Sequence, residues 1–195
     1  MKKLLILMMC GVFACGLALC GCSGGGSEEP APEEQAAPEE QAAPEEAQSG
    51  MANPWSDVAT ADEAAKVAGL EFFEVPTDAI ADMPVIQDPT FRAMEGMAEA
   101  NYEMGASAAT IRKALPSAVP EGTDASGVYE EYAHTWTINI KGLEVTCFGN
   151  DEGRATKSLW SVDDNLYSLY VQGLGGDENF GLDEDQLNSV IAEIQ

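Results

Sequence analysis

Cysteine offers the widest choice of chemistry in this chain, which has 195 residues and five cysteines. A thiolate can form a disulfide, bind zinc or attack an electrophile, and each role needs partners at a suitable spacing. Cys20 and Cys22 stand two apart at the end of an apolar run, Cys10 and Cys15 lie just upstream, and Cys147 stands alone. The first question is therefore whether the four N-terminal cysteines form a site together or belong to a segment with another purpose.

The segment that holds these cysteines has the layout of a secretory signal peptide. Lys2 and Lys3 give it a positive start, residues 4–19 form a continuous uncharged run, and small residues follow. This pattern predicts that residues 1–21 are a signal peptide that is removed. The alternative is an uncleaved transmembrane helix, because residues 4–21 have about the minimum length for one.

The end of this segment indicates how the mature chain is held. Leu19-Cys20-Gly21-Cys22 resembles the bacterial lipobox, in which a Leu and then a small residue precede the cysteine that receives lipid. Cys20 departs from the Ala, Ser or Thr that is usual at its position, although it is also small. We therefore expect Cys22 to become a lipidated N-terminus that anchors the exported protein to the outer face of the cell membrane. In a cell with two membranes the protein would be periplasmic or held at the outer membrane.

Cleavage before Cys22 removes three of the five cysteines, which excludes a disulfide scaffold and a cysteine-based zinc site. The next segment, residues 22–52, contains the repeats APEEQA at 31–36 and 37–42 and APEEAQ at 43–48. It has no aromatic or branched aliphatic side chain to bury between residues 23 and 50, and its prolines interrupt any long helix. We predict a disordered acidic spacer between the lipid anchor and a folded domain.

The charge of the chain limits its partners. It carries 34 acidic and 9 basic residues, for a formal net charge of −25. Such a charge repels phosphate backbones and anionic lipid head groups. The sequence therefore argues against nucleic-acid binding, and it predicts membrane contact through the lipid on Cys22 rather than through a basic surface.

The other groups with chemical potential lack recognisable partners. His134, the only histidine, shares the apolar face of a predicted strand, which favours a packed structural side chain over a member of a Ser-His-Asp triad. Cys147 also lies on an apolar strand face, which favours a buried thiol. Acidic residues alternate over 177–185 as in a calcium-binding loop, but Leu182 stands where that loop needs glycine. We therefore expect no metal, no cofactor and no catalytic residue.

Residues 53–195 predict one α+β domain. Thr60 and Glu63 match a capping box at the start of a helix over 60–68, and Asp183 starts a C-terminal helix expected to pack on one sheet face. Between them, alternation predicts an antiparallel meander of about six strands with tight turns at 141–142 and 163–164. These strands are expected at residues 91–104, 107–114, 132–140, 143–149, 155–162 and 165–172. The Ala, Met and Glu content of the first two suits a helix equally well.

Aromatic residues on the predicted strands suggest a place for a ligand. Five side chains could line a groove on the sheet, although packing in the core is the alternative use for such residues. They are Tyr132, His134, Trp136, Trp160 and Tyr170.

Several short motifs, taken in order, resemble the DUF4367 group of bacterial lipoproteins and envelope proteins. They are Asn53-Pro54-Trp55, EAAKVAG at 63–69, IRKA at 111–114 and DASGVY at 124–129, followed by the predicted hairpins and the acid-capped helix. The chain departs from the group in its Lys141-Gly142 turn, where Asn-Gly is more usual, and in its alanine-rich stretch at 93–109. The group has no established activity to transfer, so the resemblance implies only an extracytoplasmic sensing or binding domain.

These observations leave three functions open. The first is a non-catalytic domain that binds an unknown envelope protein or ligand, or senses the state of the envelope. The second is a carrier or chaperone for an apolar ligand, which requires a cavity between the sheet and the helices. The third is an enzyme of unknown class, which would need His134 or Cys147 in an open cleft.

Overall fold

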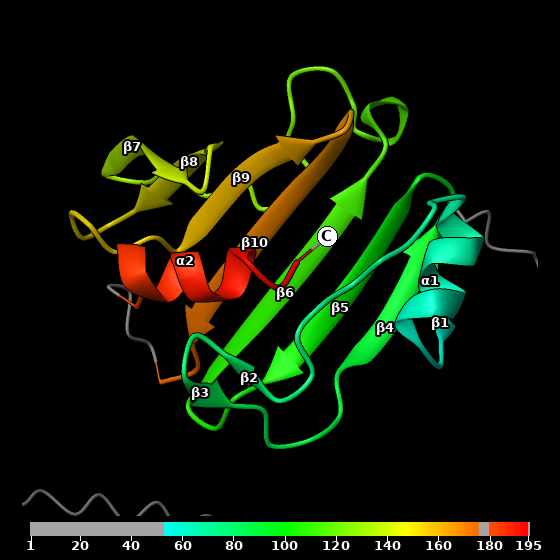
Figure 1. The fold of residues 1–195 in the computed structure, drawn as a ribbon, viewed down its shortest axis with the longest axis horizontal. Helices are drawn as coiled ribbons and strands as arrows, with labels where there is room; N and C mark the ends of the chain where they lie inside the picture. Colours follow the sequence, from blue (N-terminus) through cyan, green and yellow to red (C-terminus); the bar gives the residue numbers. More distant parts are fainter. Residues whose placement is uncertain (1–52, 176–179, 195) are drawn as a thin grey trace, which may run out of the picture. The chain divides into compact units, whose positions relative to one another are not determined.

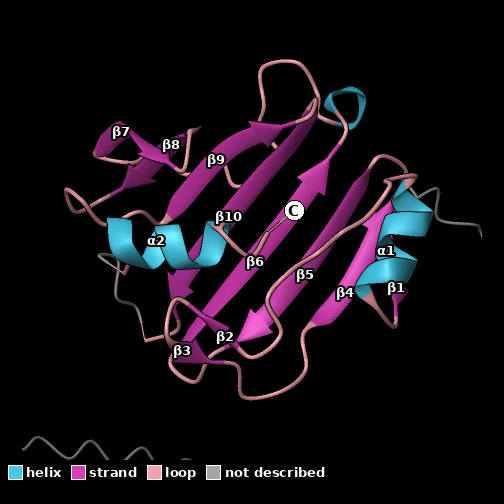
Figure 2. Cartoon of the chain, in the orientation of Figure 1, coloured by secondary structure: helices cyan, strands magenta, loops and turns pink. Residues whose placement is uncertain are grey.

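A computed structural model describes residues 53–175 and 180–194. Within them the chain is mostly β-structure, with a large antiparallel sheet of eight strands, a second sheet of two strands and two α-helices (Figure 1 and Figure 2). This architecture is compatible with the α+β class, but it has more strands than the six that were predicted. The predicted signal peptide at 1–21 and the spacer at 22–52, which includes Cys22, lie outside the described residues.

The large sheet consists of two antiparallel meanders that meet at its centre. Its strand order is β1-β4-β5-β6-β10-β9-β8-β7, so the last strand of the chain, and not β7, pairs with β6. The single meander predicted from the sequence is therefore wrong. The connection at 115–133, which contains Pro116 and Pro120, is long enough to carry the chain to the far edge before the second meander returns. The strands of the large sheet are β1 (Ser56–Val58), β4 (Thr90–Met94), β5 (Met97–Glu103), β6 (Ser107–Ala114), β7 (His134–Ile140), β8 (Leu143–Gly149), β9 (Lys157–Val162) and β10 (Asn165–Gly173).

The single strand predicted over 91–104 is a hairpin, formed by β4 and β5. Its turn includes Gly96, whose φ of 78° is a conformation that glycine adopts without steric cost. The Gly96 N–H donates to the carbonyl of Ala68 at 2.9 Å, and a Cβ at this position would lie 2.6 Å from that of Ala118. The two-stranded sheet, formed by β2 (Ala79–Ile80) and β3 (Met83–Pro84), was not predicted.

Both helices begin where their capping residues predicted. In α1 (Ala61–Ala68), the hydroxyl of Thr60 accepts the Glu63 N–H at 3.2 Å, and Gly69 ends the helix with a φ of 70°. In α2 (Glu184–Ile191), the carboxylate of Asp183 accepts the Gln186 N–H at 2.9 Å, and the Gln186 side chain accepts the Asp183 N–H at 3.1 Å. None of the helices in the described part of the chain combines the length and the apolar composition required to cross a bilayer.

Both helices cover the same face of the large sheet, which we call the helix face (Figure 1). The main core lies between this face, the two helices and the segment at 70–86. Helix α1 packs against β4 and β5, and α2 lies against β7. Fully buried members of this core include Ala64, Ala98, Ile111, Val145, Leu169 and Leu187.

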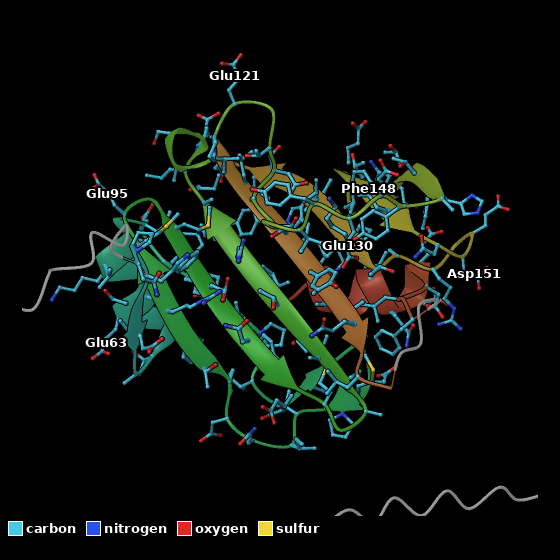
Figure 3. All side chains as sticks on the ribbon, turned by 180° about the vertical axis from the view of Figure 1, so that it is seen from behind. Glu63, Glu95, Glu121, Glu130, Phe148 and Asp151 are labelled. Carbon is cyan, nitrogen blue, oxygen red and sulfur yellow. The ribbon has the colours of Figure 1, made fainter. Side chains whose placement is uncertain are left out.

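The connection at 115–133 crosses the opposite face, which we call the loop face (Figure 3). It is held there by Lys157, whose ammonium lies 2.9 Å from the carboxylate of Asp124 and donates to the carbonyl of Val128 at 3.3 Å. The ring of Tyr132 lies over Phe148, with centroids 6.0 Å apart. The connection therefore covers the β8–β9 part of the loop face, and the two helices lie on the helix face.

The capping box of α2 yields a first prediction. Replacement of Asp183 by Ala removes the acceptor for the Gln186 N–H, and we expect the free energy of unfolding to fall by about 1 kcal/mol. Urea unfolding measures this loss. Asp185→Ala is the matched control because Asp185 lies in the same turn without a capping bond, and an equal loss in that variant would contradict the capping role.

Candidate functional site

The candidate site is a cleft of about 440 Å³ on the helix face. It lies where the turns of two hairpins, β7–β8 and β9–β10, meet the end of α2 and the segment that follows α1. Both turns depend on backbone with positive φ, at Lys141 and Gly142 in one and at Asp163 and Asp164 in the other. These are the two tight turns that the sequence predicted, and they set the position of the cleft rim.

The cleft contains a buried lysine. Lys113, near the end of β6, is 1% exposed, and its ammonium donates to the carbonyl of Phe72 at 2.9 Å. The same ammonium lies 3.6 Å from the ring centroid of Phe72 and 5.3 Å from that of Tyr167. An ammonium has three N–H donors, and the Phe72 carbonyl is the one acceptor that the described residues supply to it. The described residues supply no second hydrogen-bond acceptor to this ammonium.

The ammonium of Lys113 also lacks a directly paired counter-charge among the described residues. None of the described carboxylates forms an ion pair with its ammonium. Burial lowers the pKa of Lys113, and the more distant charges of Glu71, Glu74 and Asp163 oppose that shift without cancelling it. The described residues thus compensate the charge of this ammonium only in part, and an oxygen acceptor bound in the cleft would stabilise the charged form.

The walls of the cleft are largely apolar. Tyr167 lines the cleft, and its ring stacks on Trp160, with centroids 5.5 Å apart and planes at 11°. The buried indole N–H of Trp160 has no hydrogen-bond partner among the described residues. Burial and the charge of Asp163 raise the pKa of Tyr167 to about 12, so its phenol stays neutral at physiological pH. The remaining apolar lining comes from Ile140, Leu143, Val162, Ile191, Ala192 and Ile194. The arrangement provides a cationic donor at the bottom of a hydrophobic recess.

The five side chains predicted to line one groove are divided between the two faces of the sheet. The strand register places Trp136 and Trp160 on the helix face, together with the exposed His134. Tyr170 is paired with Lys157 on the loop face, and Tyr132 lies there over Phe148. One groove formed by all five is therefore not possible, because alternate residues of a strand point to opposite faces.

The two residues considered for catalysis lie in different surroundings, one in the core and one at the surface. Cys147 is fully buried, as predicted, and burial raises the pKa of its thiol to about 11. His134 is exposed at the start of β7, so its predicted packing on an apolar face is wrong. Part of the acidic stretch at 177–185, residues 177–179, lies outside the described residues.

Sequence reasoning missed Lys113 as a site residue, although the sequence carries a signal. In β6 the residues at 107, 109, 111 and 113 point to one face, and the first three are Ser, Ala and Ile. A lysine on the buried face of an alternating strand is unusual, because lysine side chains are rarely buried without a partner. Here the lysine lines the cleft at the end of the sheet.

A second buried charge cluster, on the loop face, has a structural explanation. The carboxylate of Glu99, which is fully buried, lies 2.5 Å from guanidinium nitrogens of both Arg92 and Arg112. Asn101 also donates to it at 2.7 Å, and the two guanidinium groups lie 4.7 and 5.3 Å from the ring centroid of Trp55. The cluster is internally paired and joins β4, β5 and β6 to Trp55, which accounts for its burial.

No family model matches the chain, and neither a curated protein nor a solved structure is detectably similar to it.

Proposed function

We propose that the protein is an exported, lipid-anchored binding protein that holds a small amphiphilic molecule in the cleft beside Lys113. The observation that carries this proposal is a buried ammonium that has one hydrogen-bond acceptor among the described residues and lines a cleft between the sheet and α2. Of the functions left open by the sequence, the cleft favours the carrier of an apolar ligand. The DUF4367 resemblance, which we propose as the assignment of residues 53–195, is compatible with such a role.

The shape and lining of the cleft define the class of ligand. Its volume of about 440 Å³ lies within the range of small-molecule sites. The apolar side chains of both hairpins and α2 would contact a hydrocarbon or ring system. The ammonium of Lys113 would bind an oxygen acceptor, either a carboxylate or a carbonyl, because it has donors to share.

The charges at the rim limit the head group further. Glu71 and Asp163 line the cleft together with Lys113 and Lys141. A head group with several negative charges would meet the two carboxylates, whereas a single carboxylate or carbonyl can reach Lys113 without close repulsion. The proposed ligand is therefore a monoanion or a neutral carbonyl compound with an apolar body.

Three probes that share a ten-carbon chain but differ in their head group test this proposal. Decanoate, methyl decanoate and decylammonium are titrated against residues 51–195, with Trp fluorescence and thermal unfolding as readouts. We expect decanoate to bind best and decylammonium least, with the ester between them, because only decanoate and the ester offer an acceptor to Lys113. Equal binding of all three would show adsorption to apolar surface and would contradict the proposal.

The lipid anchor is tested separately. Replacement of Cys22 by Ala removes the sulfur that would receive diacylglycerol, and we expect the variant to lose the acyl modification and to accumulate as unprocessed precursor. Metabolic labelling with an alkyne fatty acid, followed by detection on gels, measures this. Cys20→Ala is the matched control, and labelling that survives in the Cys22 variant would contradict the anchor.

A further inference from the structure

The edge of the large sheet formed by β7 has no neighbouring strand in the described part of the chain. β7 and β8 are joined by the two-residue turn Lys141-Gly142, and Ile140 pairs with Leu143 across it. In an antiparallel hairpin of this kind alternate residues bond to the partner strand, so Thr135, Thr137 and Asn139 direct their N–H and C=O groups outward. The edge thus presents a row of donors and acceptors in strand geometry.

This edge lacks the features that protect other sheets from pairing. Natural edges carry proline, bulges or inward-pointing charges. The sequence of β7, HTWTINI, has no proline, Asp, Glu, Lys or Arg, and its register with β8 runs one to one without a bulge. It is rich in the β-branched and aromatic residues that favour strands. Its side chains at 135, 137 and 139 are exposed. A strand of seven residues with these properties is competent to accept another strand.

An acidic hollow lies beside this edge on the helix face. It has a volume of about 550 Å³ and is lined by His134 and Trp136 of β7, together with Glu152, Asp183 and Glu184. Neither Glu152 nor Glu184 has an ion-pair partner among the described residues. A side chain on the helix face of an added strand would extend toward this hollow, because side chains of paired strands share faces.

We propose that β7 binds an extended segment of a partner protein as an additional strand, and that basic side chains of this segment enter the acidic hollow. Backbone pairing would provide affinity, and the hollow would select Lys or Arg at alternate positions. Trp136 would offer its ring face to such a cation. A second copy of this chain is a poor occupant, since each copy has a net charge of −25 and would bring the same acidic hollow to the interface.

The test uses the full chain in nanodiscs of a zwitterionic lipid and a synthetic peptide in which Lys and Val alternate. Titration calorimetry should show binding of this peptide and none of a Glu–Val peptide of equal length. The double variant Glu152→Gln with Glu184→Gln should weaken binding by at least about threefold, whereas Lys113→Met should leave it unchanged. Asp183 is kept in all variants because it caps α2.

Two further peptides test strand pairing without altering the protein. One is N-methylated on its Val residues and the other on its Lys residues, so that each loses one of the two sets of N–H donors. We expect one of them to bind at least about tenfold more weakly than the parent, and the other to bind much as the parent does. Amide exchange should slow at Thr135, Thr137 and Asn139 when the parent peptide binds. Equal affinities for all three Lys–Val peptides would overturn the proposal by showing that charge alone attracts them.

Discussion

Replacement of Lys113 by Met should abolish most of the binding of decanoate and leave the fold intact. A hydrogen bond to a charged group contributes about 1.5–3 kcal/mol, so the dissociation constant should rise by about tenfold to over a hundredfold. Met has a similar length and no charge to bury, and replacement of a buried charge by an apolar side chain is often neutral or stabilising. Calorimetric titration of residues 51–195 measures the affinity, and thermal unfolding measures stability.

The pH dependence of stability gives an independent signature of the same residue. The folded-state pKa of Lys113 is below its ordinary value of 10.5, so between the two values the unfolded chain binds more protons than the folded one. The stability of the wild-type domain should therefore increase as pH rises through this window, and Lys113→Met should lack this increase.

The control for the binding experiment is Lys141→Met, at the rim of the cleft, which should change the free energy of decanoate binding by less than about 1 kcal/mol. Loss of binding in the rim variant but not in the Lys113 variant would contradict the assigned role.

Replacement of Glu99 by Gln should cause a large loss of stability. The carboxylate of Glu99 is fully buried and is the shared partner of Arg92 and Arg112. Gln keeps the shape but leaves two guanidinium groups without a counter-charge, and breaking a buried ion pair in this way costs about 3–5 kcal/mol. Urea unfolding measures the change. Glu103→Gln, on the same strand but exposed, should cost less than about 1 kcal/mol, and similar losses in the two variants would contradict the structural role.

The same cluster should make the domain sensitive to acid. Burial alone would raise the pKa of Glu99, but its hydrogen bond to Arg92 and the charge of Arg112 outweigh burial, and the pKa is lowered from 4.5. A carboxyl group of this kind contributes stability above pH 4.5 that is lost as pH falls through the folded-state value. We therefore expect the wild-type domain to lose stability more steeply below this pH than Glu99→Gln does. Parallel slopes in the two proteins would show that Glu99 is not protonated on acid unfolding.

Local signals in the sequence predicted local structure well. The Thr60 and Asp183 caps, the Lys141-Gly142 turn and the Asp163-Asp164 turn each depend on a few adjacent residues, and the structure has all four. The hairpin at Gly96 was missed because alanine, methionine and glutamate around it show no clear alternation. The pairing of β10 with β6 could not be predicted, since it depends on the path of a long connection rather than on any pattern within the strands.

The candidate site shows the same division between local and long-range information. The side chain of Lys113 is visible in the sequence as a charge on the buried side of a strand, but its partner Phe72 lies 41 residues earlier. The predicted aromatic groove failed because it combined residues by type and overlooked that Tyr170 and Trp160 point to opposite faces. The faces on which these two side chains lie follow from the pairing of β9 with β10. The cleft itself also requires the end of α2, which forms part of its lining.

The most direct test of the proposed site is the titration of Lys113 by NMR, with lysine side chains labelled at Cε, in the free domain and with decanoate bound. We predict that Lys113 titrates below 10.5 in the free protein and that its pKa rises when decanoate supplies a carboxylate. A decanoate-bound protein in which the pKa of Lys113 does not move would contradict the assignment of this cleft as the ligand site.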